Sequence, residues 1–239
     1  LYARLDEAFS ASVADRAERI GRGPEAPARH VLTPSELAAF ADRASLSPRG
    51  RKPLPFVRLE ADGSIDAGHL ASCAGFTVVP LPPIMLDTRP WVTALERLAV
   101  GLPGARLAVG LANLSHLAIA QQIAPIGGVQ FFADVHLYTA NRWTAAFLFE
   151  RVPRLLFAYR WIEDERTEAG WQSTAAVPIV TVAPGFHAPL FASRGCFAKH
   201  VLNRGACPAG CPRDFRVDLR QGGRRFQAVV EDCVTYLFA

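Results

Sequence analysis

The sequence predicts an α/β protein that folds as a TIM-like (β/α) barrel. Short apolar segments of β-like composition alternate with amphipathic helical patterns along the chain. This pair of elements recurs every ~20 to 30 residues, which is typical of βα units. An open, doubly wound sheet would give the same repeat and remains the alternative. Because the strand candidates are fewer than a full barrel requires, we expect the barrel to be incomplete in this chain.

Several segments have the length and apolar content of β-strands. They are residues 2–5, 55–59, 76–80, 106–110, 129–133, 154–158 and 177–182. Pro- and Gly-rich stretches interrupt the pattern, and we expect loops there, at residues 21–27, 47–55 and 80–83.

Helices are expected between these strands, at residues 88–100, 113–123 and 141–149. In the first helix, Trp91, Leu95 and Leu98 recur at helical spacing, as the buried face of an amphipathic helix does. The third begins with Asn141, whose side chain favours the N-cap position.

The composition is typical of a soluble globular protein, with 50% hydrophobic and 20% charged residues among 239. No stretch contains the ~20 apolar residues of a membrane-spanning helix. The chain starts at Leu1, without Met and without the basic-then-apolar pattern of a signal peptide. We therefore expect a cytoplasmic protein with no membrane span, and a chain that is part of a longer protein.

The basic residues are concentrated near the end of the chain. The net charge is +4 and the pI is about 9.0, a mild excess that permits an acidic partner such as RNA. A solvated basic surface is the other interpretation of the late arginines. These are Arg204, Arg213, Arg216, Arg220, Arg224 and Arg225.

Most of the cysteines also lie near the end of the chain. Of the five, four fall within the last 44 residues, at Cys196, Cys207, Cys211 and Cys233. An odd count without a secretion signal argues against a disulfide framework and favours metal or redox chemistry. Thiolates this close in sequence converge on one soft metal centre once the loop between them folds. The fifth, Cys73, stands among small residues, and we expect it to be a core residue.

The spacing of the four cysteines leaves the metal open. Ten, three and twenty-one residues separate them. Zinc ligands usually come as two close pairs, whereas this chain has one close pair and two distant single cysteines. The spacing favours a [4Fe–4S] cluster slightly over zinc, and free buried cysteines are the remaining interpretation. We divide the chain into a βα-repeat barrel portion, residues 1–185, and a C-terminal cysteine-rich iron–sulfur segment of the same domain, residues 186–239.

Several segments of the chain resemble the peptidase U32 family. They are residues 133–141 (ADVHLYTAN) with the Ala-rich helix that follows, residues 105–114 (ARLAVGLANL) and residues 81–84 (LPPI). The most specific match is residues 189–196 (PLFASRGC), followed by the close pair Cys207 and Cys211 and then by Cys233. The resemblance spans most of the chain from about residue 55 onward. Tyr138 is a departure, because the family usually has Asn there.

The resemblance implies a TIM-like barrel that carries a [4Fe–4S] cluster on Cys196, Cys207, Cys211 and Cys233. Some family members are described as collagenase-like proteases, and others resemble proteins needed for oxygen-independent hydroxylation of RNA bases or of the ubiquinone ring. The residues favour a redox enzyme or enzyme subunit, because the Gly-x-Ser-x-Gly and His-Glu-x-x-His motifs are absent from the sequence and an iron-bound cysteine is not free to attack a peptide. A U32-type peptidase with a structural cluster and a non-catalytic module that positions a partner remain the alternatives.

Candidate site residues follow the expected strand at residues 129–133. Asp134, His136, Tyr138 and Asn141 fall where such barrels place substrate contacts, at the carboxyl ends of strands. Turn formation, capping or core packing is their alternative role. Arg194 precedes the first cluster cysteine and is a candidate to bind an anionic group or a cluster sulfur, with a surface salt bridge as its alternative. The expected partners are RNA, a protein or peptide substrate, and a partner subunit.

Overall fold

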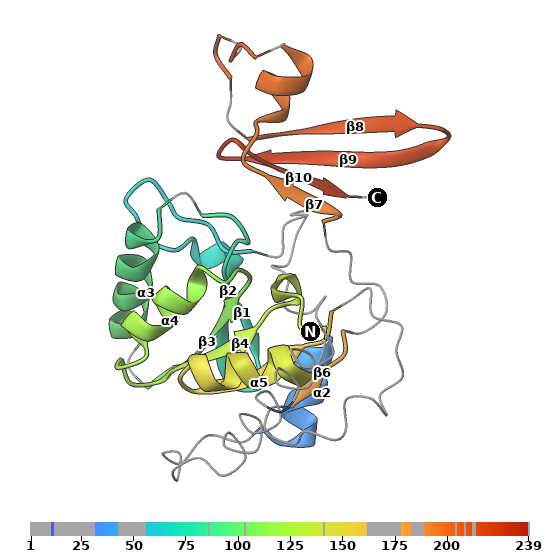
Figure 1. Cartoon of the computed structure of the whole chain (residues 1–239). Coiled ribbons are helices and arrows are strands. Elements are labelled where there is room, and N and C mark those ends of the chain that lie inside the picture. The colour runs from blue at the N-terminus through green and yellow to red at the C-terminus, as the bar shows by residue number, and fades with distance from the viewer. Residues whose placement is uncertain are drawn as a thin grey trace. The chain divides into compact units, whose positions relative to one another are not determined.

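A computed structural model describes residues 11, 32–42, 56–85, 87–102, 104–140, 142–161, 178–182, 189–203, 205–207, 209–211 and 214–238 (Figure 1). The chain forms two compact units. The N-terminal unit comprises residues 1–82 and 87–183, and the C-terminal unit comprises residues 83–86 and 184–239. The expected strand at residues 2–5 lies outside the described residues.

A six-stranded sheet forms the centre of the N-terminal unit. Its spatial order follows the chain order, and the sheet is curled like half of a barrel. The first pair of strands is antiparallel and the later pairs are parallel. The predicted α/β class is therefore confirmed. The strands are β1 (Ala71–Cys73), β2 (Phe76–Pro80), β3 (Arg106–Leu111), β4 (Val129–Ala133), β5 (Leu155–Tyr159) and β6 (Ile179–Val180).

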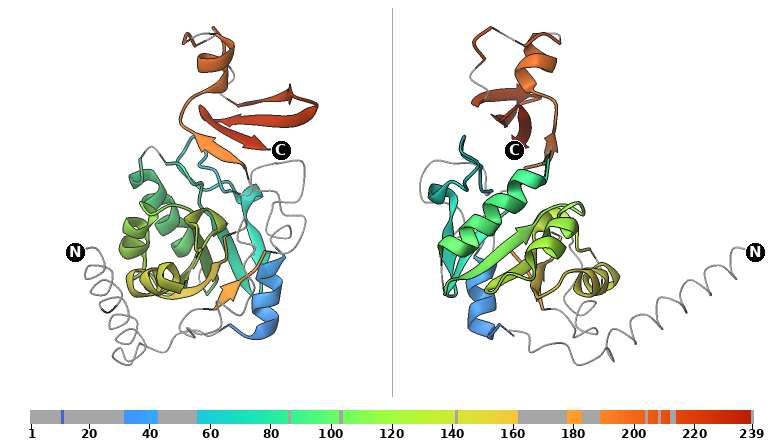
Figure 2. Two further views of the ribbon diagram at one scale, coloured as in Figure 1. Left: turned by 45° about the vertical axis from the view of Figure 1, so that its right-hand side comes forward. Right: turned by 90° about the vertical axis from the view of Figure 1, so that its left-hand side faces the viewer.

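Helices connect the parallel strands, as the sequence predicts. α3 (Arg89–Gly101) follows β2, α4 (His116–Ile123) follows β3, and α5 (Arg142–Arg151) follows β4. α4 begins later than the expected residue 113, because Asn113 Oδ1 accepts a hydrogen bond from the Ser115 backbone N–H at 3.0 Å and forms a turn ahead of the helix. α3 and α4 lie on one side of the strands (Figure 2).

The other face of the sheet carries a helix that the sequence pattern did not predict, α2 (Pro34–Ala41). It begins with a capping box, in which the Thr33 side chain accepts from the Glu36 backbone and the Glu36 side chain accepts from the Thr33 backbone. α2 contacts β1 and β6, the two edge strands of the sheet. Arg106 of β3 pairs with Glu36 at 3.9 Å. The helix therefore spans the concave face from one edge of the sheet to the other.

Phe40 anchors α2 to this face. Its side chain has no exposed surface, and its ring centroid lies 4.8 Å from that of Phe157, 5.9 Å from that of Phe76 and 6.1 Å from that of Phe132. The Tyr159 hydroxyl donates a hydrogen bond of 2.6 Å to the Phe40 carbonyl oxygen. Aromatic side chains from β2, β4 and β5 thus form one cluster around the last turn of α2.

The expected strand at residues 55–59 is wrong. Among the described residues of this segment, Leu59 forms only an isolated bridge with Ile65. The segment joins β2 through one backbone hydrogen bond, from the Val57 N–H to the Pro80 carbonyl oxygen at 2.8 Å. The physical reason is that β1 already pairs with the free edge of β2. The β1–β2 hairpin turns at Ala74 and Gly75, which both have positive φ.

An antiparallel sheet forms the C-terminal unit, where the sequence pattern indicated only a cysteine-rich segment. The strand order is β7-β10-β9-β8. Residues 196–211 contain the π-helix η5 (Ala198–Leu202) and lead into β8. The strands are β7 (Phe191–Ser193), β8 (Phe215–Gln221), β9 (Arg224–Glu231) and β10 (Val234–Phe238).

Gly110 of β3 lies where the sheet is most closely packed. A Cβ atom there would lie 2.5 Å from Cζ and 2.8 Å from Cε2 of Phe132, and 3.2 Å from Oδ2 of Asp134. The Phe132 ring is fully buried and stacks on Phe157, with 5.2 Å between the ring centroids. We therefore expect Gly110→Ala to lower the free energy of unfolding by about 1–3 kcal/mol, measured by urea denaturation.

Gly127→Ala is the matched control, because a Cβ atom at Gly127 meets no atom within 4 Å. This variant should unfold within about 0.5 kcal/mol of the wild type. Equal stability of the two variants would contradict the close packing of β3 against β4.

Candidate functional site

Two of the sequence-predicted site residues lie at the carboxyl end of β4. Asp134 is fully buried, and its Oδ1 accepts a hydrogen bond of 2.6 Å from the Val135 N–H at the start of the short helix η3 (Val135–Leu137). The Asp134 N–H donates to the Leu111 carbonyl oxygen of β3. His136 lies within η3 and is half-buried. Asp134 and His136 thus both lie at the carboxyl ends of the parallel strands, where such sheets bind ligands.

Aromatic rings lie near Asp134 and His136 at these strand ends. The buried Phe56 ring lies 5.4 Å from the His136 ring. Tyr138 ends η3 in the left-handed region (φ 51°, ψ 48°), and 62% of its surface is exposed. Its ring meets that of Trp161 edge-to-face at 5.8 Å. A bulky residue with positive φ is uncommon, and such strain is often found at functional sites.

Two further residues at these strand ends, Arg160 and Thr139, were not predicted from the sequence as site residues. Arg160 follows β5 directly and is 8% exposed, and the Thr139 side chain is fully buried. A backbone hydrogen bond of 3.1 Å, from the Trp161 N–H to the Thr139 carbonyl oxygen, ties the two segments together. The signal for Arg160 was its place after an apolar strand. Because arginine is usually a surface residue, the residue type alone did not indicate that Arg160 is buried.

The remaining candidates lie elsewhere or outside the description. Asn141 is not among the described residues. Arg194 follows β7 in the C-terminal unit and is exposed. Neither residue is therefore placed with Asp134 and His136.

His116, at the start of α4, is a buried base at the carboxyl end of β3. It has no exposed surface, and its Nδ1 accepts a hydrogen bond of 3.1 Å from the Ala112 N–H. Within the described part of the chain, its Nε2 has no hydrogen-bond partner. Burial lowers the pKa of His116 from 6.5 to about 4. The imidazole is therefore neutral at physiological pH and serves as a structural acceptor.

The lowered pKa predicts acid sensitivity. Between pH 6.5 and pH 4 the unfolded chain binds a proton at His116 that the folded chain does not bind. Stability at this group is therefore lost as the pH falls through that window, by up to about 3 kcal/mol. His116→Gln keeps an acceptor but does not titrate, so its stability should fall less over the same window. Urea denaturation of both proteins at several pH values measures the difference, and equal losses would contradict it.

In the C-terminal unit, Cys196 is held between two hydrogen bonds to one side chain. The Thr235 hydroxyl of β10 donates to the Gly195 carbonyl oxygen at 2.7 Å and accepts from the Phe197 N–H at 3.0 Å. Cys196 is 5% exposed and precedes the π-helix η5, whose residue His200 donates its N–H to the Cys196 carbonyl oxygen. π-helical turns are frequent at functional sites.

Cys233 is placed by a tight turn. Asp232 and Cys233 connect β9 to β10 with φ of 46° and 63°, values that favour Asn-Gly in a two-residue hairpin. A non-glycine residue in this region costs roughly 1–2 kcal/mol. The Asp232 N–H donates to Asp214 Oδ1 at 2.8 Å, which stabilises the turn. Cys233 packs against the same apolar cluster as Cys196, together with Phe197, Phe215 and Val230.

The other two cysteines lie on the loop that precedes β8. Cys207 is exposed and Cys211 is half-buried. All five cysteines of the chain are free thiols. Among the described residues, no three His, Cys, Asp or Glu side chains lie close enough together to hold a metal ion. The structure thus associates Cys196 with Cys233 and does not bring Cys207 and Cys211 to them.

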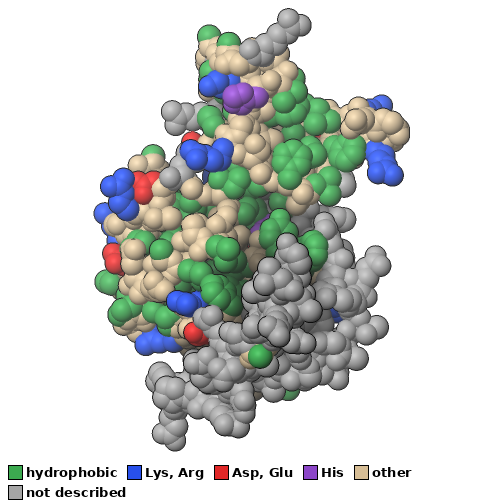
Figure 3. All heavy atoms as spheres, in the orientation of Figure 1, with side chains coloured by type: hydrophobic (Ala, Val, Ile, Leu, Met, Phe, Trp, Pro, Cys, Tyr) green, Lys and Arg blue, Asp and Glu red, His purple; other side chains and the backbone are tan. Residues whose placement is uncertain are grey.

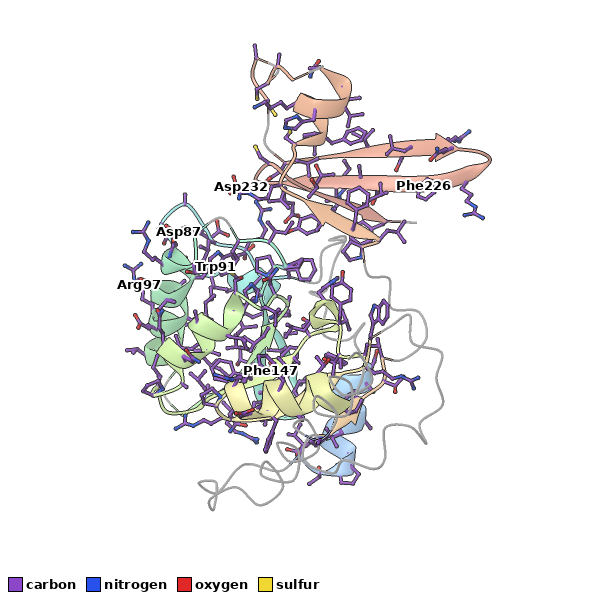
Figure 4. All side chains as sticks on the ribbon, in the orientation of Figure 1. Asp87, Trp91, Arg97, Phe147, Phe226 and Asp232 are labelled. Carbon is purple, nitrogen blue, oxygen red and sulfur yellow. The ribbon has the colours of Figure 1, made fainter. Side chains whose placement is uncertain are left out.

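The chemistry of the cysteines, rather than their positions, is compatible with an iron–sulfur cluster. Four free thiols belong to one unit, and a cluster requires soft sulfur ligands. Figure 4 shows sulfur atoms on the side of the C-terminal unit that carries Asp232. Cys73 differs from these four, because burial, with a smaller effect of Asp42, raises the pKa of its thiol to about 11. It is 8% exposed, as expected of a core residue.

Within the described residues, no helix combines the length and apolar character that crossing a membrane requires. No protein-family model, no curated protein and no solved structure matches the sequence.

Proposed function

We propose that this chain is a U32-type iron–sulfur protein, an enzyme or enzyme subunit for oxygen-independent hydroxylation of RNA or of an aromatic ring. In this proposal, Cys196, Cys207, Cys211 and Cys233 bind a [4Fe–4S] cluster, with zinc as the alternative metal. When bound, such a cluster supplies electron transfer or activation of an oxygen donor.

The observation that carries the proposal is that Cys196 and Cys233 pack against the same group of apolar side chains. Two hydrogen bonds to Thr235 fix the backbone on either side of Cys196. The turn that presents Cys233 requires positive φ at a residue other than glycine. Such local strain persists where the surrounding structure imposes it and where the residue has a function. In the proposal, Cys207 and Cys211 complete the ligand set.

The carboxyl edge of the parallel sheet supports an aromatic substrate. Tyr138 and Trp161 offer ring faces and edges, and the half-buried His136 offers a polar contact at the same end of the sheet. Aromatic side chains beside a few polar groups are typical of sites that bind planar rings.

A TIM-like barrel fold and a cytoplasmic location are part of the same proposal. The sequential parallel strands with intervening helices support a TIM-like (β/α) barrel, of which the curled sheet is a part. The free cysteines support a reducing compartment such as the cytoplasm.

The test compares the wild-type chain with a variant in which the four cluster cysteines are replaced by serine. Both are expressed in an oxygen-free culture, and digested RNA and extracted quinones are examined by mass spectrometry. We expect products that have gained one oxygen atom only with the wild type. Gelatin cleavage by both proteins, without any oxygenated product, would instead establish the peptidase with a structural cluster.

A further inference from the structure

We propose that the chain forms a homodimer through β8, the edge strand of the C-terminal sheet, which pairs antiparallel with β8 of a second copy. The strand order β7-β10-β9-β8 places β8 at one end of this sheet, and among the described strands β8 pairs with β9 alone (Figure 1). An edge strand of seven residues is a template for pairing with another chain. This inference goes beyond the proposed function and does not depend on the metal.

The turn of the β8–β9 hairpin fixes which backbone groups of β8 face the open edge. Gly222 and Gly223 have φ of 56° and 78°, as a two-residue type I′ turn requires. In such a turn the flanking pair, Gln221 and Arg224, exchanges backbone hydrogen bonds, and bonded and non-bonded pairs alternate from there along the strands. The backbone N–H and C=O groups of every second residue of β8 therefore point away from β9. These residues are Arg216, Asp218 and Arg220.

The side chains of β8 separate onto two faces of the sheet. One face is apolar and half-buried, and it carries Phe215, Val217 and Leu219. The other face is charged and exposed, and it carries Asp214, Arg216, Asp218 and Arg220. The sign of the charge alternates along this face. Because the order is acidic, basic, acidic, basic, the strand is complementary to its own reverse.

The charge pattern favours one register of the pair, with Val217 of one copy opposite Val217 of the other. In this register Arg216 faces Asp218 of the second copy, and Asp214 faces its Arg220. The two-fold symmetry makes both contacts twice, which gives four ion pairs. A shift of two residues in either direction brings like charges together, and a shift of one residue places apolar side chains against charged ones.

The backbone and the apolar face agree with this register. Arg216 and Asp218 both direct backbone groups to the edge, so they exchange main-chain hydrogen bonds across the two copies. On the other face, Val217 meets its own counterpart, and Phe215 meets Leu219 of the second copy. These half-buried side chains extend the apolar face from one sheet onto the next.

β9 does not neutralise the charge of Arg220. Arg220 lies directly opposite Arg225 of β9, and like charges in this arrangement destabilise a hairpin. Within the described residues, no ion pair or hydrogen bond involves the Arg220 side chain. Figure 3 shows basic side chains at this end of the hairpin. Asp214 of a second copy would offset the repulsion.

The edge fits a second copy better than an unrelated peptide. Charged side chains on an edge strand normally prevent pairing. Charges of one sign would repel every copy, whereas the alternating charges of β8 lose this repulsion in one register. A peptide would need the same alternation of apolar, acidic and basic residues, which a second copy always has.

Sedimentation velocity of the full chain at several protein concentrations tests the dimer. We expect the dimer fraction to rise with concentration, because an interface of one strand pair is small. The double variant Arg216→Glu and Arg220→Glu places like charges in all four ion pairs, so its dissociation constant should rise at least about tenfold. A wild-type chain that stays monomeric at every concentration would overturn the inference.

The matched control is the double variant Arg97→Glu and Arg151→Glu, which makes the same change of charge at exposed positions of the N-terminal unit. It should keep the dissociation constant of the wild type. Equal weakening by this control would mean that net charge, rather than β8, governs association, and the proposed interface would be wrong.

A charge exchange between two variants tests the pairing itself. Asp218→Arg turns two of the four ion pairs into contacts between arginines and should weaken its own dimer. Mixed with the double variant Arg216→Glu and Arg220→Glu, it faces opposite charges in three of the four pairs, so we expect a heterodimer to form. Absence of this heterodimer, with both variants folded by circular dichroism, would contradict the pairing.

Cross-linking tests the register. In a non-hydrogen-bonded pair the Cα atoms lie about 4.5 Å apart, within the range of a disulfide. After oxidation with diamide, Val217→Cys should therefore give a covalent dimer whose peptide map links residue 217 to residue 217. Leu219→Cys is the control on the same face, because the two copies of residue 219 would lie roughly 13 Å apart along the strands. A link between the two copies of residue 219, or none at residue 217, would refute the register.

Discussion

Cys196→Ser is expected to abolish cluster binding. Anaerobically purified wild-type protein should contain about four iron atoms per chain, and the variant should contain less than about one. The reason is that Cys196 is the cysteine whose backbone is fixed on both sides, by the two hydrogen bonds of Thr235. Serine occupies the same space but is a poor ligand for iron. Iron and sulfide analysis, with the visible absorption spectrum, measures the loss.

Cys73→Ala is the control for this prediction. Cys73 belongs to β1 of the other unit, and burial raises the pKa of its thiol to about 11, which disfavours the thiolate that binds metals. The control should keep the iron content of the wild type. Equal iron in Cys196→Ser and the wild type, with both folded by circular dichroism, would remove Cys196 from the ligand set.

Phe40→Ala is expected to have the largest effect on stability. The ring fills the centre of an aromatic cluster formed by Phe76, Phe132 and Phe157 and has no exposed surface. Its removal leaves a cavity beneath α2, the helix that contacts both edge strands. We expect the free energy of unfolding to fall by about 3–5 kcal/mol, as measured by urea denaturation followed by tryptophan fluorescence.

Phe147→Ala provides the comparison, because Phe147 of α5 is 38% exposed. Truncation there should cost about 0.5 kcal/mol. A loss below about 1 kcal/mol for Phe40→Ala would mean that α2 does not stabilise the sheet.

Much of the parallel sheet could be predicted because its strands are buried on both faces and read as continuous apolar runs. β2 and β4 have the predicted bounds for this reason. The segment at residues 55–59 has similar composition, yet β1 pairs with the edge of β2 that it would have used. Apolar composition indicates burial rather than strand pairing. A segment that is buried without pairing can therefore have the same composition as a strand. α2 was missed because Phe40 is its single buried residue.

The C-terminal sheet could have been predicted from an alternation that was present. Phe215, Val217 and Leu219 alternate with Arg216, Asp218 and Arg220, which is the pattern of a half-exposed strand. The cysteines and arginines around this segment are also typical of loops, and that composition hid the period of two.

The candidate site was predictable in part. Asp134 and His136 were proposed because polar residues directly follow a buried strand, and the four cysteines were proposed as ligands because they cluster in sequence. Thr235 and the strained turn at Cys233 could not be found, because a threonine within a strand and a cysteine after an aspartate carry no sequence signal. Their roles arise from the pairing of β10 with β7 and β9.

The cluster is tested most directly by purifying the chain without oxygen and measuring its iron, sulfide and zinc together with its absorption spectrum. The proposal predicts about four iron atoms and matching sulfide per chain, with a broad band near ~400 nm that dithionite bleaches. A colourless protein with one zinc atom, or with neither metal, would contradict it.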